Sequence, residues 1–102
     1  MAGFVQIIEV QSSRMDELRQ LTDDYRAKRE ADASGPMPAR SVLTEDRDRP
    51  GVFLNVVEFS SYEEAMENSQ RPDTGEFARR MAELCDAPPR FYNLDVMETW
   101  SR

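Results

Sequence analysis

The sequence predicts an α+β domain in which helices cover one face of an antiparallel sheet. Segments rich in Val, Ile and Phe alternate with segments whose apolar residues recur every three or four positions. Two of the apolar segments are joined by a short polar stretch, as in a β-hairpin. The chain has 102 residues, a common size for one hydrophobic core. We therefore expect residues 1–102 to form a single domain.

The first two elements are a strand and a long helix. Residues 3–10, GFVQIIEV, are rich in β-forming residues, and both alternating faces are largely apolar. Ser13, followed three residues later by Asp16, is an N-cap pattern, so a helix is predicted over 14–31. Its apolar stripe follows the helical spacing and consists of Met15, Leu18, Leu21, Thr22 and Tyr25.

A hairpin is predicted next. The segment 33–38, ASGPMP, should stop the helix because its glycine suits a left-handed cap and its prolines cannot continue a helix. A weak strand at 39–45 then meets a polar turn at 46–51, where Pro50 and Gly51 suit the central positions of a type II turn. The segment 52–60, VFLNVVEFS, is the strongest strand in the sequence.

The second half predicts a broken helix and a last strand. The pairs Ser61–Glu64 and Asp73–Glu76 both match the capping-box pattern at a helix start. Pro72 stands between them, so we expect one short helix after residue 61 and another from about residue 73. The segment 86–89, DAPP, ends the second helix, and 90–100 reads as a strand.

The predicted order, β-α-β-β-α-β, is that of the ferredoxin-like fold, with helices on one face of the sheet and the second helix broken near Pro72. The opposite face would be bare. The strands carry apolar residues of both parities, so either choice of buried face leaves apolar side chains exposed, and a large apolar patch is normally covered by a partner. We therefore expect a homodimer through the sheet faces. The residues behind this expectation are Val5, Ile7, Val57, Phe59, Leu94 and Val96.

Charge and composition exclude several classes of function. Thirteen Lys and Arg against twenty Asp and Glu give a net charge of −7, which opposes binding to nucleic acid or to anionic membranes. The sequence has no histidine, which removes Ser-His triads and most zinc sites. No apolar run approaches the roughly 20 residues of a membrane span, and no signal peptide is evident. The lone Cys85 agrees with a cytoplasmic location.

The segment NVVEFSSYEEAMENSQRPDTGEF (55–77) resembles the antibiotic-biosynthesis-monooxygenase (ABM) type of the dimeric α/β-barrel superfamily. In that type a strand leads into a glutamate and an aromatic residue, a S-x-E-E-A helix start, a broken helix and a final strand with an aromatic end. The resemblance implies a dimeric α/β barrel and cofactor-free oxygenation of phenolic substrates. The matching residues are Glu58, Phe59, Ser61, Glu63, Glu64, Ala65, Phe77 and Trp100.

The sequence departs from that pattern where enzymatic members often carry a histidine. Asn68 or Ser69, followed by Asp73, occupy the comparable positions. Asparagine and serine form hydrogen bonds but cannot shuttle protons near neutral pH as imidazole does. The haem-degrading branch needs such a histidine and is therefore excluded. No motif is specific enough to assign a catalytic residue.

Five residues are candidates for substrate binding, and each has a simpler structural role. Asn55 interrupts an apolar strand, so it is either a buried amide bonded to nearby backbone or a pocket donor for a substrate oxygen, and Asn93 shares the ambiguity. Arg40 is either a solvated edge charge or a clamp for an acidic or phenolate substrate. Tyr92 is either a core residue or a pocket hydroxyl. Trp100, close to the chain end, suggests first a dimer contact and second a pocket wall.

Two function classes remain open from the sequence. The first is an ABM-like enzyme that acts on a hydrophobic substrate, either aromatic or polycyclic, without metal or flavin. The second is a non-catalytic dimer that binds a small molecule or serves as an accessory protein. No metal is expected, because the acidic residues at 45–48 alternate with arginines in a solvated turn. No glycine-rich phosphate loop is present either.

Overall fold

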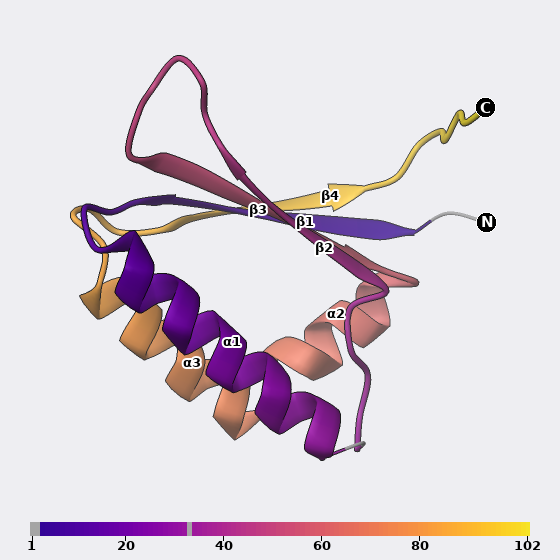
Figure 1. Ribbon diagram of the computed structural model, residues 1–102. Coiled ribbons are helices and arrows are strands. Elements are labelled where there is room, and N and C mark those ends of the chain that lie inside the picture. The colour runs from indigo at the N-terminus through magenta and orange to yellow at the C-terminus, as the bar shows by residue number, and fades with distance from the viewer. Residues whose placement is uncertain (1–2, 33) are drawn as a thin grey trace.

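The computed structural model describes residues 3–32 and 34–102, and there an antiparallel four-stranded sheet has three helices against one face (Figure 1). The strand order β2-β3-β1-β4 places the first and third strands in the centre, so the ferredoxin-like prediction is confirmed. The elements are β1 (Phe4–Gln11), α1 (Met15–Ala31), β2 (Arg40–Glu45), β3 (Val52–Phe59), α2 (Tyr62–Ser69), α3 (Pro72–Glu83) and β4 (Arg90–Asp95). Among these, no helix is long and apolar enough to span a membrane.

The even-numbered side chains of β1 face the helices. Phe4 pairs across the sheet with Phe59, and both are buried. The core forms two clusters, one under α2 and one under α1 and α3, and the partly buried Ile8 packs against both. Their buried members are Phe4, Val57, Phe59 and Ala65 in the first cluster, and Val10, Leu18 and Met81 in the second.

All three helices lie on one side of the sheet, and none of them covers the opposite face (Figure 1). That face carries several apolar side chains. Strand alternation and register place one row straight across the four strands on this outer face. The row consists of Val42, Val56, Ile7 and Tyr92. Val5 and Leu94 form a second pair on the same face, and Leu94 is exposed. Val57 and Phe59, by contrast, lie on the helix side.

The predicted turn and the first capping box are confirmed by hydrogen bonds. Val52 N–H donates to the Arg49 carbonyl at 3.1 Å across Pro50 and Gly51. Gly51 has a φ of 88°, as the third position of a type II turn requires. At the start of α2 the Ser61 hydroxyl oxygen accepts from Glu64 N–H at 3.1 Å, which satisfies one free helix donor.

Two other predicted caps are wrong. The Ser13 hydroxyl donates to Asp86 at 3.2 Å, whereas Ser12 Oγ accepts from Arg14 N–H at 3.0 Å before α1. Helix α3 begins with Pro72, without a side-chain cap at Arg71. The expected Asp73–Glu76 box does not form because each carboxylate pairs with an arginine instead, Asp73 with Arg71 and Glu76 with Arg79. Proline at the first helical position needs no cap for its own nitrogen.

The last strand ends at Asp95, so the predicted strand over 90–100 is too long. Its neighbour β1 begins at Phe4, directly opposite Asp95. One more bond, from Val96 N–H to the Gly3 carbonyl at 3.0 Å, closes the ladder. Beyond it the side chain of Trp100 is 80% exposed. Ala33, the first residue of the predicted stop at 33–38, lies outside the described residues.

Candidate functional site

A cavity of about 160 Å³ lies between the helices and the sheet. Its walls come from α1 and α3 on one side and from β1, β2 and β3 on the other. Most of the lining is apolar, with a few polar groups within it and charged groups from α1. The lining residues are Ile8, Val10, Met15, Leu18, Arg19, Thr22, Asp23, Arg26, Ser41, Leu43, Asn55, Phe77 and Met81.

Asn55 and Ser41 supply the polar groups on the sheet side of the cavity. Asn55 lies on β3 between Ile8 of β1 and Leu43 of β2, so strand alternation turns it toward the helices. Its carbonyl oxygen accepts a hydrogen bond from the Ser41 hydroxyl at 3.0 Å. Its amide nitrogen makes no hydrogen bond with any described residue, which leaves N–H donors for a ligand oxygen.

The charged groups of the cavity lie on α1. Arg19, Asp23 and Arg26 are all exposed, so they border its opening rather than its interior. Arg26 pairs with Asp23 at 3.7 Å. None of Arg19, Arg26 and Ser41 was among the site residues predicted from the sequence. A usable signal existed, because positions 15, 18, 19, 22 and 26 continue one helical stripe.

Asn55 is the one predicted site residue that lines this cavity. Arg40 lies on the outer face of the sheet, where it pairs with Glu58 at 3.3 Å. Tyr92 lies on the same outer face and donates to Glu9 at 2.9 Å, and this hydrogen bond raises the pKa of the phenol. Asn93 faces the helix side but is exposed and accepts from Gln6 at 3.1 Å. Trp100 extends beyond the sheet.

A second hollow, of about 420 Å³, runs between α1 and α3. Charged residues make up more than half of its lining, carboxylates outnumber basic groups, and most of these charged side chains are exposed. Ligand pockets are mostly apolar with a few convergent polar groups, which describes the smaller cavity better. The charged residues of this groove are Glu17, Asp24, Lys28, Asp73, Glu76, Arg80 and Glu83.

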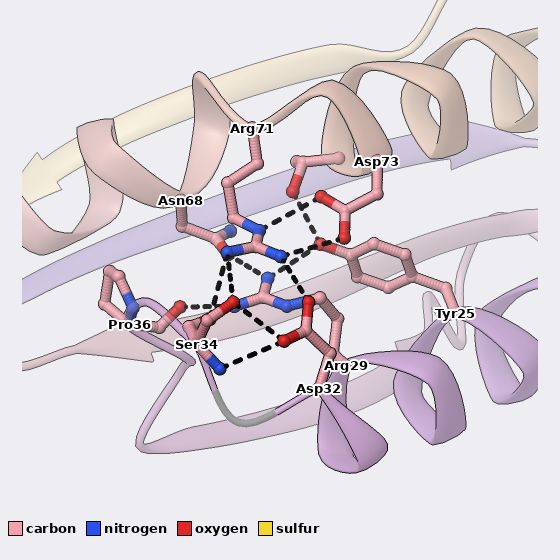
Figure 2. Close-up of polar contacts among 9 residues, drawn as sticks. Tyr25, Arg29, Asp32, Ser34, Pro36, Asn68, Arg71 and Asp73 are labelled. Carbon is pink, nitrogen blue, oxygen red and sulfur yellow. Dashed lines mark hydrogen bonds and ion pairs between the residues drawn. The ribbon is translucent and has the colours of Figure 1, made fainter.

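A buried arginine organises the break between α2 and α3 (Figure 2). Arg29 is only 1% exposed. Its guanidinium donates to the Pro36 carbonyl at 2.7 Å, to the Tyr25 hydroxyl at 3.2 Å and to the side-chain carbonyl of Asn68. The Tyr25 hydroxyl also bonds Thr74 at 2.7 Å. Asn68 occupies a position where enzymatic members of the ABM type often carry a histidine. Here its side-chain carbonyl accepts a structural hydrogen bond from Arg29.

Arg71 forms a second set of contacts beside Arg29 (Figure 2). It pairs with Asp73 at 3.0 Å and with Asp32 at 3.2 Å, and it donates to the Ser34 carbonyl at 2.9 Å. The hydrogen bond from Arg71 lowers the pKa of Asp73. These contacts tie the loop after α1 to the helix break. The polar residues of the break therefore serve the architecture and do not line the smaller cavity.

The cavity can orient a ligand but supplies no internal acid or base. Its one carboxylate, Asp23, is exposed and lies near Arg26. Cys85 donates its S–H to the Met81 carbonyl, and burial raises the pKa of the thiol, so the thiol is not activated. Among the described residues no group of His, Cys, Asp and Glu could hold a metal ion.

Comparison with known proteins places the fold. No family model matches the sequence, and no curated protein matches it. Rv0793 from Mycobacterium tuberculosis is similar in structure, with a TM-score of 0.75 and 19% identity over 97% of this chain and 99% of that one. SnoaB, a cofactor-independent oxygenase from Streptomyces nogalater, gives a TM-score of 0.73 and 15% identity over 99% and 97%.

A third match carries a bound ligand. The monooxygenase from the gene ActVA-Orf6 of Streptomyces coelicolor, solved with Nanaomycin D, has a TM-score of 0.75 and 13% identity over 99% of this chain and 93% of that one. Another matching structure is described as an antibiotic biosynthesis monooxygenase. The chain therefore has the ferredoxin-like fold of ABM-type structures, as the resemblance indicated.

Proposed function

We propose that the protein binds a single-ring aromatic molecule in the cavity between α1 and the sheet and oxidises it with O₂ without metal or flavin. The observation that carries this proposal is the cavity itself, with apolar walls and one free amide donor at Asn55. Its volume of about 160 Å³ matches the roughly 150 Å³ that takes up benzene in an apolar protein cavity. It is smaller than the roughly 300 Å³ or more of pockets for drug-sized ligands, which favours one ring over a polycyclic substrate.

The substrate must supply the electrons, because the lining offers no redox group. A phenol suits this role. Its net reaction with O₂ gives a quinone and water, as one C–H and one O–H bond break and a new ring carbonyl forms. One oxygen atom enters the ring, and the other leaves as water with the two substrate hydrogens. In this scheme Asn55 orients the phenolic oxygen, and the apolar wall excludes water from the reacting ring.

The alternative is a binding protein without catalysis. The absence of an acid or base from the cavity interior favours it, since a neutral amide cannot carry a proton. The two functions share the ligand site and differ only in whether O₂ is consumed. One experiment can therefore test both.

Methionine methyl groups provide the reporters for that experiment. Met15 and Met81 line the cavity, whereas Met97 is 92% exposed and lies outside it. Titration of methyl-labelled protein with 2-methoxyphenol should shift the Met15 and Met81 signals in a saturable way and leave Met97 unchanged. An oxygen electrode, run in parallel, should record uptake of one O₂ for each quinone formed.

The two asparagines on the helix side of the sheet form a matched pair for mutation. Asn55→Ala should weaken 2-methoxyphenol binding about two- to tenfold, the range expected for one hydrogen bond. Asn93→Ala, outside the cavity, should change it less than twofold. Shifts at Met97 alone, or no saturable shift at Met15 and Met81, would contradict the proposed site. Binding without oxygen uptake by this phenol would favour the non-catalytic alternative.

We also propose that the protein is a homodimer through the outer face of the sheet, in a cytoplasmic setting. The support is the apolar row across all four strands, centred on Val56 and Ile7, which no described helix covers. The wet face of an antiparallel sheet is normally polar. This face carries the Arg40–Glu58 ion pair, but apolar side chains of the row lie at its centre. A second copy offers the same apolar row, so the contact is self-complementary.

A further inference from the structure

We infer that the ligand carries an anionic group, such as a carboxylate, that binds Arg19 and Arg26 at the opening of the cavity. This inference rests on the proposed function, because it assumes that the cavity between α1 and the sheet is the ligand site. It adds the chemical class of the ligand: an aromatic acid about one ring in size. An oxygen at the other end of the ring would reach Asn55.

The two arginines lie on one face of α1. They are seven residues apart, about two helical turns, and both line the cavity. Arg19 makes no ion pair or hydrogen bond with any described residue, so its donors are free. Arg26 has one ion pair, with Asp23 at 3.7 Å, and these side chains are 55% and 63% exposed. Two guanidiniums therefore face one loosely held carboxylate.

This opening has the opposite charge to its surroundings. The whole chain has a net charge of −7, and acidic residues outnumber basic ones in the lining of the groove between α1 and α3. An approaching anion is repelled over most of the molecule and attracted at the cavity. The guanidinium group also matches a carboxylate with two parallel hydrogen bonds, which an isolated ammonium cannot provide.

A simpler role for these side chains is to cover the cavity with their methylene stems. The two roles predict different results. If the arginine stems only cover the cavity, they affect the affinity of every ligand of the same shape. If the guanidinium charges bind the ligand, they raise the affinity of the anion alone. The comparison therefore needs two ligands that differ in charge and little else.

Such a pair is 4-hydroxybenzoate and 4-hydroxybenzamide, titrated separately at neutral pH and followed by the Met15 and Met81 methyl signals. The natural sequence should bind the acid about tenfold more tightly than the amide. Arg19→Gln and Arg26→Gln should each weaken acid binding about three- to tenfold and change amide binding less than twofold. Arg47→Gln, an equal change of charge in the exposed turn outside the cavity, should leave both affinities within twofold.

Salt and a conservative variant complete the test. Added salt should weaken binding of the acid and leave the amide unaffected, since mobile ions screen exposed charges. Arg19→Lys should keep part of the preference for the acid. Equal affinities for acid and amide in the unmodified protein would overturn this inference while leaving the cavity as the ligand site. If neither compound moves the cavity signals, the proposed function fails together with the inference.

Discussion

At the residue scale, Arg29 is the most unusual group in the protein. It is a charged side chain at 1% exposure whose acceptors are all neutral: a backbone carbonyl, a hydroxyl and an amide oxygen. Its Nε has no partner among the described residues. Burial of a charge costs several kcal/mol unless hydrogen bonds compensate. The balance between these two effects decides whether Arg29 stabilises the fold.

We expect the hydrogen bonds to outweigh the desolvation. Arg29→Met should lower the free energy of unfolding by about 2–4 kcal/mol, because it leaves the oxygen acceptors of Pro36 and Asn68 without a hydrogen-bond donor. Urea denaturation measures this change. Lys28→Met, at an exposed neighbouring position, should stay within about 0.5 kcal/mol of the natural sequence. Equal or higher stability of Arg29→Met would show that desolvation of the guanidinium is the larger effect.

The Arg71–Asp73 pair should make stability depend on acid pH. Arg71 lowers the pKa of Asp73 in the folded state. The stabilisation is therefore complete above the unfolded value of about 3.9 and is lost as the pH falls through the lower folded pKa. Asp73→Asn should lose less stability than the natural sequence between about pH 6 and about pH 3.

The matched control for that measurement is Asp48→Asn. Asp48 lies in the exposed turn between β2 and β3 and makes no ion pair with any described residue. Its substitution should leave the acid dependence of the unfolding free energy unchanged. Identical pH profiles for Asp73→Asn and the natural sequence would rule out a contribution from this pair.

At the element scale, the break between α2 and α3 shows two ways to begin a helix. Helix α2 uses a local side-chain cap at Ser61, whereas α3 uses Pro72 and the salt bridges of Arg71. The first depends on residues three positions apart and was predicted. The second depends on Asp32 and Ser34, which are distant in sequence, and was not.

Ser61→Ala should therefore lower the free energy of unfolding by about 1 kcal/mol, the usual effect of losing an N-cap. Ser69→Ala removes a hydroxyl from the other end of α2, where it donates to the Met66 carbonyl. This control variant should change stability by less than about 0.5 kcal/mol. Thermal or urea unfolding, followed by circular dichroism, measures both. A neutral Ser61→Ala would mean that water replaces the cap of Glu64 N–H.

At the scale of the whole molecule, the uncovered sheet face is the feature that calls for a partner. The proposed dimer should give twice the chain mass of 11.8 kDa in light scattering at micromolar concentration. Val56→Glu places a charge between Ile7 and Val42 on this face and should yield a folded monomer. Ala82→Glu, exposed on α3, should remain dimeric. A natural sequence that is monomeric under these conditions would overturn the dimer.

The candidate site was only partly predictable. Asn55 was identified because asparagine is a poor strand former and stands here among apolar residues. Arg40 was expected to be either a solvated edge charge or a clamp. It lies on the outer face in an ion pair with Glu58, and Arg19 and Arg26 border the cavity instead. Strand alternation says which residues share a face, but which face meets the helices depends on the packing of the whole sheet.

Local sequence patterns were enough to predict the order of the elements and the ferredoxin-like fold. Apolar periodicity, the Pro50–Gly51 turn and the Ser61 cap each depend on residues close together in the sequence. Such local signals can be recognised in a single sequence. The contacts of the arginine side chains and the end of the last strand depended on tertiary structure and could not be predicted from local patterns. A long guanidinium finds its acceptors among distant segments, as Arg29 does at Asn68, and β4 ends opposite Phe4, the first residue of its neighbour β1.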